Sequence, residues 1–164
     1  MPESNCSLRR LAHFAPFFVC QVLLWNFSTQ VLDHVDLNMK DPTFMRWSKT
    51  SNQLAIGTGR GELLLYDRTN RTCWYANAKH KKRITCGDWN NENKFAFASD
   101  DRQITICSAD GKTSGQVKVK SRPTNVKFGG NQEERENIVS VSMDRKTILL
   151  YNLDDPEVTN TIES

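Results

Sequence analysis

Short apolar runs, each bounded by polar turn residues, recur along most of the chain. Between Lys79 and Cys107, the runs RITCGDW, KFAFAS and QITIC are separated by NNEN and DDR. Runs of this length between turn signals predict three antiparallel strands in a meander. In KFAFAS, large and small apolar residues alternate, so both faces of the strand are apolar. We expect neighbouring sheets to cover both faces, since a solvated sheet would present polar residues on one of them.

The same pattern returns with a nearly constant period. The third strands of successive units end at apolar or aromatic residues that lie 41, 41 and 44 residues apart, at Trp25, Tyr66, Cys107 and Tyr151. A second column, in phase with the first, consists of Trp47, Trp89 and Phe128. A third column begins at Leu54, Phe95 and Ile138. A period of about 40 to 45 residues with four short strands per unit is typical of the blades of a WD40-type β-propeller.

A short polar residue closes the third strand of each unit. These residues are Asn26, Asp67, Ser108 and Asn152. Side chains of these types hydrogen-bond nearby backbone groups and favour turns. We therefore expect each of them to start the turn into the outer strand, without any catalytic role.

The number of units falls short of a closed ring. The 164 residues hold about three full four-stranded blades and one extra strand pair, whereas propellers close with about 4 to 8 blades. The predicted fold is therefore all-β: an open arc of a partial propeller over residues 21–164, which we expect to be a fragment of a longer protein. Because the faces of its terminal blades lack neighbours, we expect the isolated arc to self-associate or aggregate.

Residues 1–20 lie outside the repeat pattern. Arg9 and Arg10 precede an apolar run, as in a secretory signal, but Glu3 and Pro16 disturb the pattern and no small-x-small cleavage site follows. The run is too short and too interrupted to span a bilayer. Two alternatives stay open. The segment is an extraneous N-terminus joined to a strand of the propeller, or it is the signal of a secreted glycoprotein that would use the Asn-x-Ser/Thr triplets of the chain.

Composition and motifs give no support to an enzyme. The net charge of +3 is too small to argue for nucleic acid or membrane binding by the whole domain. Five cysteines without a CxxC pair or zinc-like spacing indicate reduced thiols instead of disulfides or zinc. Hydrolase and metalloprotease motifs are missing, and the glycines of GTGRG join two strands without the helix that a phosphate loop needs. We expect no catalytic residues, no cofactor and no metal.

The densest basic cluster lies between an outer strand and the next inner strand, where propellers display binding loops. It consists of Lys79, His80, Lys81, Lys82 and Arg83. The cluster is either a solvated loop, a docking site for an acidic protein surface or a nucleic-acid contact. The lack of stacking aromatic residues beside the charges argues against nucleic acid. These five residues are the candidate partner-binding site.

His80 also has a structural interpretation. In WD repeats, a histidine at this loop position can hydrogen-bond towards the Ser or Thr of the second strand and the Asp of the following turn, which braces the blade. The candidates here are Ser99 with Asp100 or Asp101. The network normally ends in a tryptophan on the third strand, where this chain has Cys107, so a complete network is not predicted.

The stretch KHKKRITCGDWNNEN resembles a propeller blade of the WD-repeat subunit of intraflagellar transport complex A. WNFSTQ, LAIGTGRGELLLYDRTNRT, ITICSADG and VKSRPTN agree with that family in the same order, so that the resemblance covers about Val22 to Asn152. It implies a non-enzymatic protein-interaction scaffold for retrograde ciliary transport and cilium assembly, located in the cilium and in the cytoplasm at the ciliary base. The implied partners are other subunits of the complex and ciliary cargo adaptors, with no small-molecule substrate. The alternative is an RNA-binding or other cytosolic WD-repeat scaffold.

Overall fold

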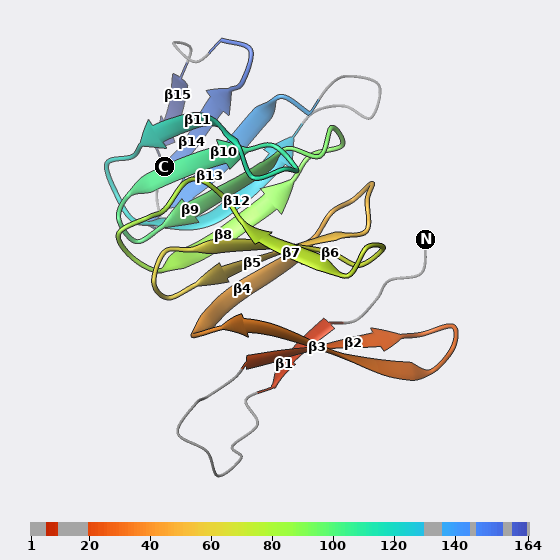
Figure 1. Cartoon of the computed structure of the whole chain (residues 1–164). Coiled ribbons are helices and arrows are strands. Elements are labelled where there is room, and N and C mark those ends of the chain that lie inside the picture. The colour runs from red at the N-terminus through yellow and green to blue at the C-terminus, as the bar shows by residue number, and fades with distance from the viewer. Residues whose placement is uncertain (1–5, 10–19, 130–135, 145–146, 156–158, 164) are drawn as a thin grey trace. The chain divides into compact units, whose positions relative to one another are not determined.

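The computed structural model describes residues 6–9, 20–129, 136–144, 147–155 and 159–163 (Figure 1). Their regular elements are all strands, and they pair in chain order into four antiparallel sheets. The first sheet contains β1 (Cys6–Arg9), β2 (Cys20–Asn26) and β3 (Val31–Met39). The second contains β4 (Pro42–Trp47), β5 (Gln53–Thr58), β6 (Leu63–Asp67) and β7 (Thr72–Tyr75).

The other two sheets follow the same meander. The third contains β8 (Ile84–Trp89), β9 (Phe95–Ser99), β10 (Gln103–Cys107) and β11 (Thr113–Lys118). The fourth contains β12 (Pro123–Gly129), β13 (Ile138–Met143), β14 (Thr147–Asn152) and β15 (Thr159–Glu163). The three four-stranded sheets are the three full blades that the repeat columns predicted. In the part of the chain that the structure describes, no helix is long and apolar enough to cross a membrane.

The chain divides into two compact units, residues 1–42 and 43–164. In the first unit, β2 pairs with β1 on one side and with β3 on the other. The sheet therefore has three strands where the repeat pattern accounted for a pair, because β1 comes from the segment outside the pattern. Trp25 and Val31, near the β2–β3 turn, are exposed. The division of the chain at residue 20 stays a prediction.

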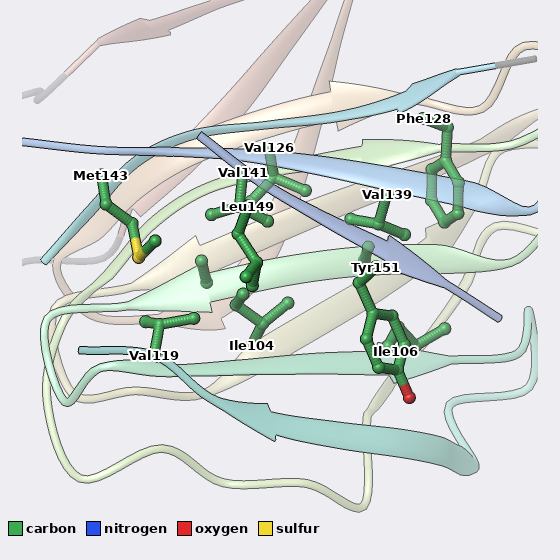
Figure 2. Packing of buried hydrophobic residues seen from close by; sticks show 12 residues of the cluster. Ile104, Ile106, Val119, Val126, Phe128, Val139, Val141, Met143, Leu149 and Tyr151 are labelled. Atoms are coloured by element: carbon green, nitrogen blue, oxygen red, sulfur yellow. The ribbon is translucent and has the colours of Figure 1, made fainter. Parts of the chain in front are cut away.

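In the second unit, the alternating residues of β9 pack against both neighbouring sheets. Phe95 and Phe97 belong to a buried cluster with residues of the second sheet such as Leu65. Ala96 and Ala98 belong to a different cluster, built largely from the fourth sheet. Figure 2 shows this second cluster, in which side chains of β10 face those of β13 and β14. All four residues are fully buried, which confirms that both faces of the strand are covered.

One repeat column needs a correction by one residue. Trp89 pairs with Phe95, and the equivalent Phe128 pairs with Val139. The third column therefore continues at Val139, and the expectation that it continues at Ile138 is wrong. Since strand side chains alternate, this shift exchanges the faces: Val139 is fully buried, whereas Ile138 is exposed.

The polar residues that close the third strands start turns, as predicted. The Asn26 side chain accepts a hydrogen bond from the Ser28 N–H at 3.0 Å. Asp67 accepts one from the Thr69 N–H at 2.8 Å. Each side chain thus replaces a backbone acceptor in a tight turn and directs the chain into the outer strand.

Gly61 occupies the turn between β5 and β6 with a φ of +83°. A Cβ atom there would lie 2.1 Å from the carbonyl oxygen of His80, and the His80 N–H donates to the Gly61 carbonyl at 2.9 Å. The glycine therefore allows a left-handed turn and the close approach of two main chains. This is the turn predicted for the GTGRG segment.

Candidate functional site

The segment between β7 and β8 places His80 inside the second unit and leaves its neighbours in solvent. The His80 residue is only 3% exposed. Its ring packs edge-on against Phe97, with 5.1 Å between the ring centroids. The backbone bond to Gly61 described above fixes the start of the loop, so that the ring enters the blade from a fixed main-chain position.

Both nitrogens of the His80 ring have partners. Nδ1 lies 3.0 Å from each carboxylate oxygen of Asp101, and Nε2 lies 3.1 Å from the Thr105 hydroxyl. The Gln116 amide donates to the same hydroxyl at 3.3 Å. One assignment satisfies all four residues: Nδ1–H donates to Asp101, and the Thr105 hydroxyl donates to Nε2. We call these four residues the His80 network.

Asp101 also fixes the main chain around the network. Its carboxylate accepts hydrogen bonds from the Lys81 N–H at 2.9 Å and from the Gln103 N–H at 3.0 Å. Burial would raise the pKa of this carboxyl, but the hydrogen bonds from the Lys81 backbone and the His80 ring outweigh it and hold the pKa below its usual value. The carboxylate thus joins the loop, the turn and the ring.

The other predicted members of this site lie apart from the ring. Ser99 donates to the Lys82 carbonyl at 2.9 Å and accepts from the Asp101 N–H at 3.1 Å, so it braces the loop backbone. Asp100 binds Arg122 through two hydrogen bonds of 2.5 and 3.0 Å. Sequence reasoning missed Thr105, which lies on β10 two residues before Cys107. The signal was available, because residues two apart on a strand share a face.

Four of the predicted repeat positions are core residues of the second unit. Tyr66, Trp89, Phe128 and Tyr151 are buried. Trp89 donates its indole N–H to the Arg46 carbonyl at 3.0 Å and so ties β8 to β4 of the preceding sheet. Trp47, in the same column, is half-buried.

A row of charged residues crosses the first strands of the three four-stranded sheets, β4, β8 and β12. Each charged residue lies one position before a residue of the column Trp47, Trp89 and Phe128. Asp88 lies 3.1 Å from Arg46 and 3.6 Å from Lys127, and it also accepts the Phe128 N–H at 3.3 Å. The Asp88 side chain is 5% exposed, so a nearly buried carboxylate connects three successive blades. Sequence reasoning missed this row, although each residue directly precedes Trp47, Trp89 or Phe128.

The cationic side chains of the predicted cluster point away from the network. Lys79 pairs with Glu62 at 2.7 Å, while Lys81, Lys82 and Arg83 are exposed. Among the side chains that the structure describes, these last three have no ion-pair partner. Because Glu62, like Asp100 and Asp101 nearby, already has a partner, the charge displayed by this loop is positive.

The chemistry of the site is that of a brace. His80 is buried and both its nitrogens are hydrogen-bonded to side chains of the same unit, so the ring holds the loop to the blade. Within the described ranges, no group of three or more His, Cys, Asp and Glu side chains could hold a metal ion. What the site offers to another molecule is the exposed loop.

A family model described as the first β-propeller of WDR19 matches residues 19–163. The chain belongs to this family. WD repeat-containing protein 19 of Mus musculus is 36% identical over 142 residues, and that of Homo sapiens is 35% identical. WD repeat-containing protein dyf-2 of Caenorhabditis elegans is 26% identical over 145 residues. These matches cover 82 to 83% of this chain but only 10 to 11% of the relatives, so the WDR19-family chain spans about a tenth of their length.

Solved structures show the same fold at low sequence identity. A chain in the crystal structure of the mitotic checkpoint complex matches with a TM-score of 0.73 and 15% identity, over 95% of this chain and 46% of that one. The β-propeller domain of Cps50 (Swd1) from Myceliophteria thermophila matches with a TM-score of 0.65 and 15% identity, over 77% of this chain and 40% of that domain. The fold is therefore a partial WD40-type β-propeller.

Proposed function

We propose that this chain is part of a non-enzymatic protein-interaction scaffold of intraflagellar transport complex A, which acts in retrograde ciliary transport and cilium assembly. The observation that carries the proposal is the match of residues 19–163 to the first propeller of WDR19. The His80 network supports it, because a histidine buried in a brace is not a catalytic group. The proposed location is the cilium and the cytoplasm at the ciliary base.

The proposed partner surface consists of the exposed members of the predicted cluster, Lys79, Lys81, Lys82 and Arg83. His80 is buried beneath this surface and supports it. Its bonds to Asp101 hold the loop in one conformation, and a preformed loop loses less conformational entropy on binding. The partners that we propose are other subunits of the complex or ciliary cargo adaptors with acidic surfaces.

The proposal is tested by affinity purification of the tagged full chain from ciliated cells, followed by mass spectrometry. We expect other complex A subunits to co-purify with the wild-type chain. A variant with Lys81→Glu and Lys82→Glu should recover them less well, whereas Lys112→Glu, in the turn between β10 and β11, should not change their recovery. If the wild-type chain recovers no complex A subunit, the assignment is wrong. If both variants behave like the wild type, the partner surface is elsewhere.

RNA binding is the second candidate, and the exposed cations Lys81, Lys82 and Arg83 favour it. Contacts from these three residues to a single strand would release counterions and give a slope of about −2 for log K against log salt concentration. We would measure binding of a labelled single-stranded RNA by anisotropy over a salt series. Binding with a slope near zero, or no binding at low salt, excludes this function.

A further inference from the structure

The second unit has two junctions between blades: the first joins the second and third sheets, and the second joins the third and fourth sheets. Both have the same strand registers but are built from different side chains. Ile84 pairs with Ser99, and Pro123 pairs with Met143. Met143 therefore stands in the fourth sheet where Ser99 stands in the third. Each position of the first junction therefore has an equivalent position in the second.

His80 and Thr105 also have counterparts at the second junction. Val119 lies four residues before β12, as His80 lies four residues before β8, and the Val119 N–H donates to the Arg102 carbonyl at 2.9 Å. In the fourth sheet Leu149 pairs with Val141, and at the equivalent position of the third sheet Thr105 pairs with Phe97. In the second junction, valine and leucine thus replace the histidine and the threonine of the His80 network.

This replacement coincides with an open cleft of about 410 Å³. Val119 and Leu149, the apolar counterparts of His80 and Thr105, line it together with Met143, the counterpart of Ser99. A valine is smaller than a histidine and bonds no turn carboxylate, which accounts for space at this position. The volume lies within the range of about 300 to 1,000 Å³ that ligand pockets occupy.

Charged residues border the apolar lining. Lys118 and Lys120 also line the cleft, and both are exposed. Neither forms an ion pair with a side chain that the structure describes. The cleft therefore combines an apolar surface with two cations, and it is complementary to an occupant that is apolar at its centre and anionic at its ends.

We propose that this cleft binds a large apolar side chain carried by an acidic protein segment, whose carboxylates pair with Lys118 and Lys120. The apolar side chain packs on Val119, Met143 and Leu149. A binding site at the second junction is independent of the function proposed above, because it uses none of the residues of the His80 loop.

The first test compares peptides on the unmodified full chain. The probe is a dye-labelled Glu-Asp-Glu-Phe-Glu-Asp-Glu peptide, and the matched probe has Ala in place of Phe. Anisotropy titrations should give an affinity about tenfold higher for the Phe peptide, as expected for partial burial of a ring. A peptide with Lys in place of each acidic residue should not bind. Equal affinities for the Phe and Ala peptides, or no binding of either, would overturn the proposal.

The second test changes the cleft. Val119→Phe fills it from the loop side, and Thr147→Phe fills it from β14, so that one variant serves if the other fails to fold. Each should remove the preference for Phe over Ala. The Lys118→Glu and Lys120→Glu double variant should weaken the Phe peptide about tenfold at low salt and less at high salt. Lys112→Glu, at an exposed residue that does not line the cleft, should leave the preference for Phe unchanged. A folded, filled variant that still prefers Phe would place the binding elsewhere.

Discussion

Replacing Thr105 by valine tests whether the His80 network holds the first junction together. The Thr105 side chain is fully buried, and its hydroxyl lies 3.1 Å from His80 Nε2. Valine keeps the branched shape, so the variant removes the hydroxyl without opening a cavity. It leaves a buried ring nitrogen without a partner, which costs about 1 to 3 kcal/mol. We expect the free energy of unfolding to fall by that amount.

The assay is urea unfolding of the full chain, followed by tryptophan fluorescence and circular dichroism. The matched control is Thr113→Val, because Thr113 lies exposed on β11 of the same sheet. A second pair of variants carries His80→Phe with and without Thr105→Val. Once the ring nitrogen is gone, the loss of the hydroxyl should cost about 1 kcal/mol less than in the wild-type background, since residues in contact are not additive.

Two results would refute this reasoning. If Thr105→Val changes the free energy of unfolding no more than Thr113→Val does, the hydrogen bond to His80 contributes nothing to stability. If the cost of Thr105→Val is the same with His80 as with Phe at position 80, the two side chains are not coupled. In either case, Thr105 would not replace the tryptophan that normally ends this network, and the brace would be incomplete.

Three further predictions use other positions of the second unit. Asp101→Asn should destabilise the protein at neutral pH and progressively less as the pH falls below about 4, because a carboxyl whose folded-state pKa is lowered adds stability that is full above its unfolded pKa and is lost as the pH falls towards the folded pKa; a pH-independent cost in urea unfolding would contradict this. Gly61→Ala should lower the free energy of unfolding by more than about 1 kcal/mol, whereas Gly129→Ala, with no atom within 4 Å of its added Cβ, should be nearly neutral; equal costs would refute the close approach. Burial raises the pKa of the Cys107 thiol to about 12, so iodoacetamide should modify exposed Cys73 but not Cys107 in native protein; modification of both at similar rates by peptide mass spectrometry would be the contrary result.

The blades could be predicted from the sequence because their signals are local. Alternation within each run gives the strands and their faces, and the period of the aromatic columns gives their grouping. The exception is the column at Ile138. The charged segment NQEERE before it lengthens that unit, so counting residues no longer fixes the register. Pairing of Val139 with Phe128 fixes it instead, and pairing between strands cannot be read from either strand alone.

The candidate site was predictable only in part, because its contacts join residues that are distant in the sequence. The sequence named two aspartates as possible partners of His80, and nothing local distinguishes them. In the structure, Asp101 binds the ring and Asp100 turns to Arg122 of the next loop. Thr105 was not predicted for a related reason: the expected partner on that strand was a tryptophan at the position of Cys107, and Thr105 lies two residues before it.

The two junctions show how one backbone frame can serve two different purposes. At the first, a buried histidine satisfied on both nitrogens specifies a single loop conformation, since a fully hydrogen-bonded polar network is rigid and costly to rearrange. At the second, the side chains of Val119 and Leu149 occupy the same positions and cannot form hydrogen bonds, and apolar contacts impose no comparable direction. The first junction is therefore suited to hold charged side chains in fixed positions on its surface. The second keeps space that a partner's side chain can fill.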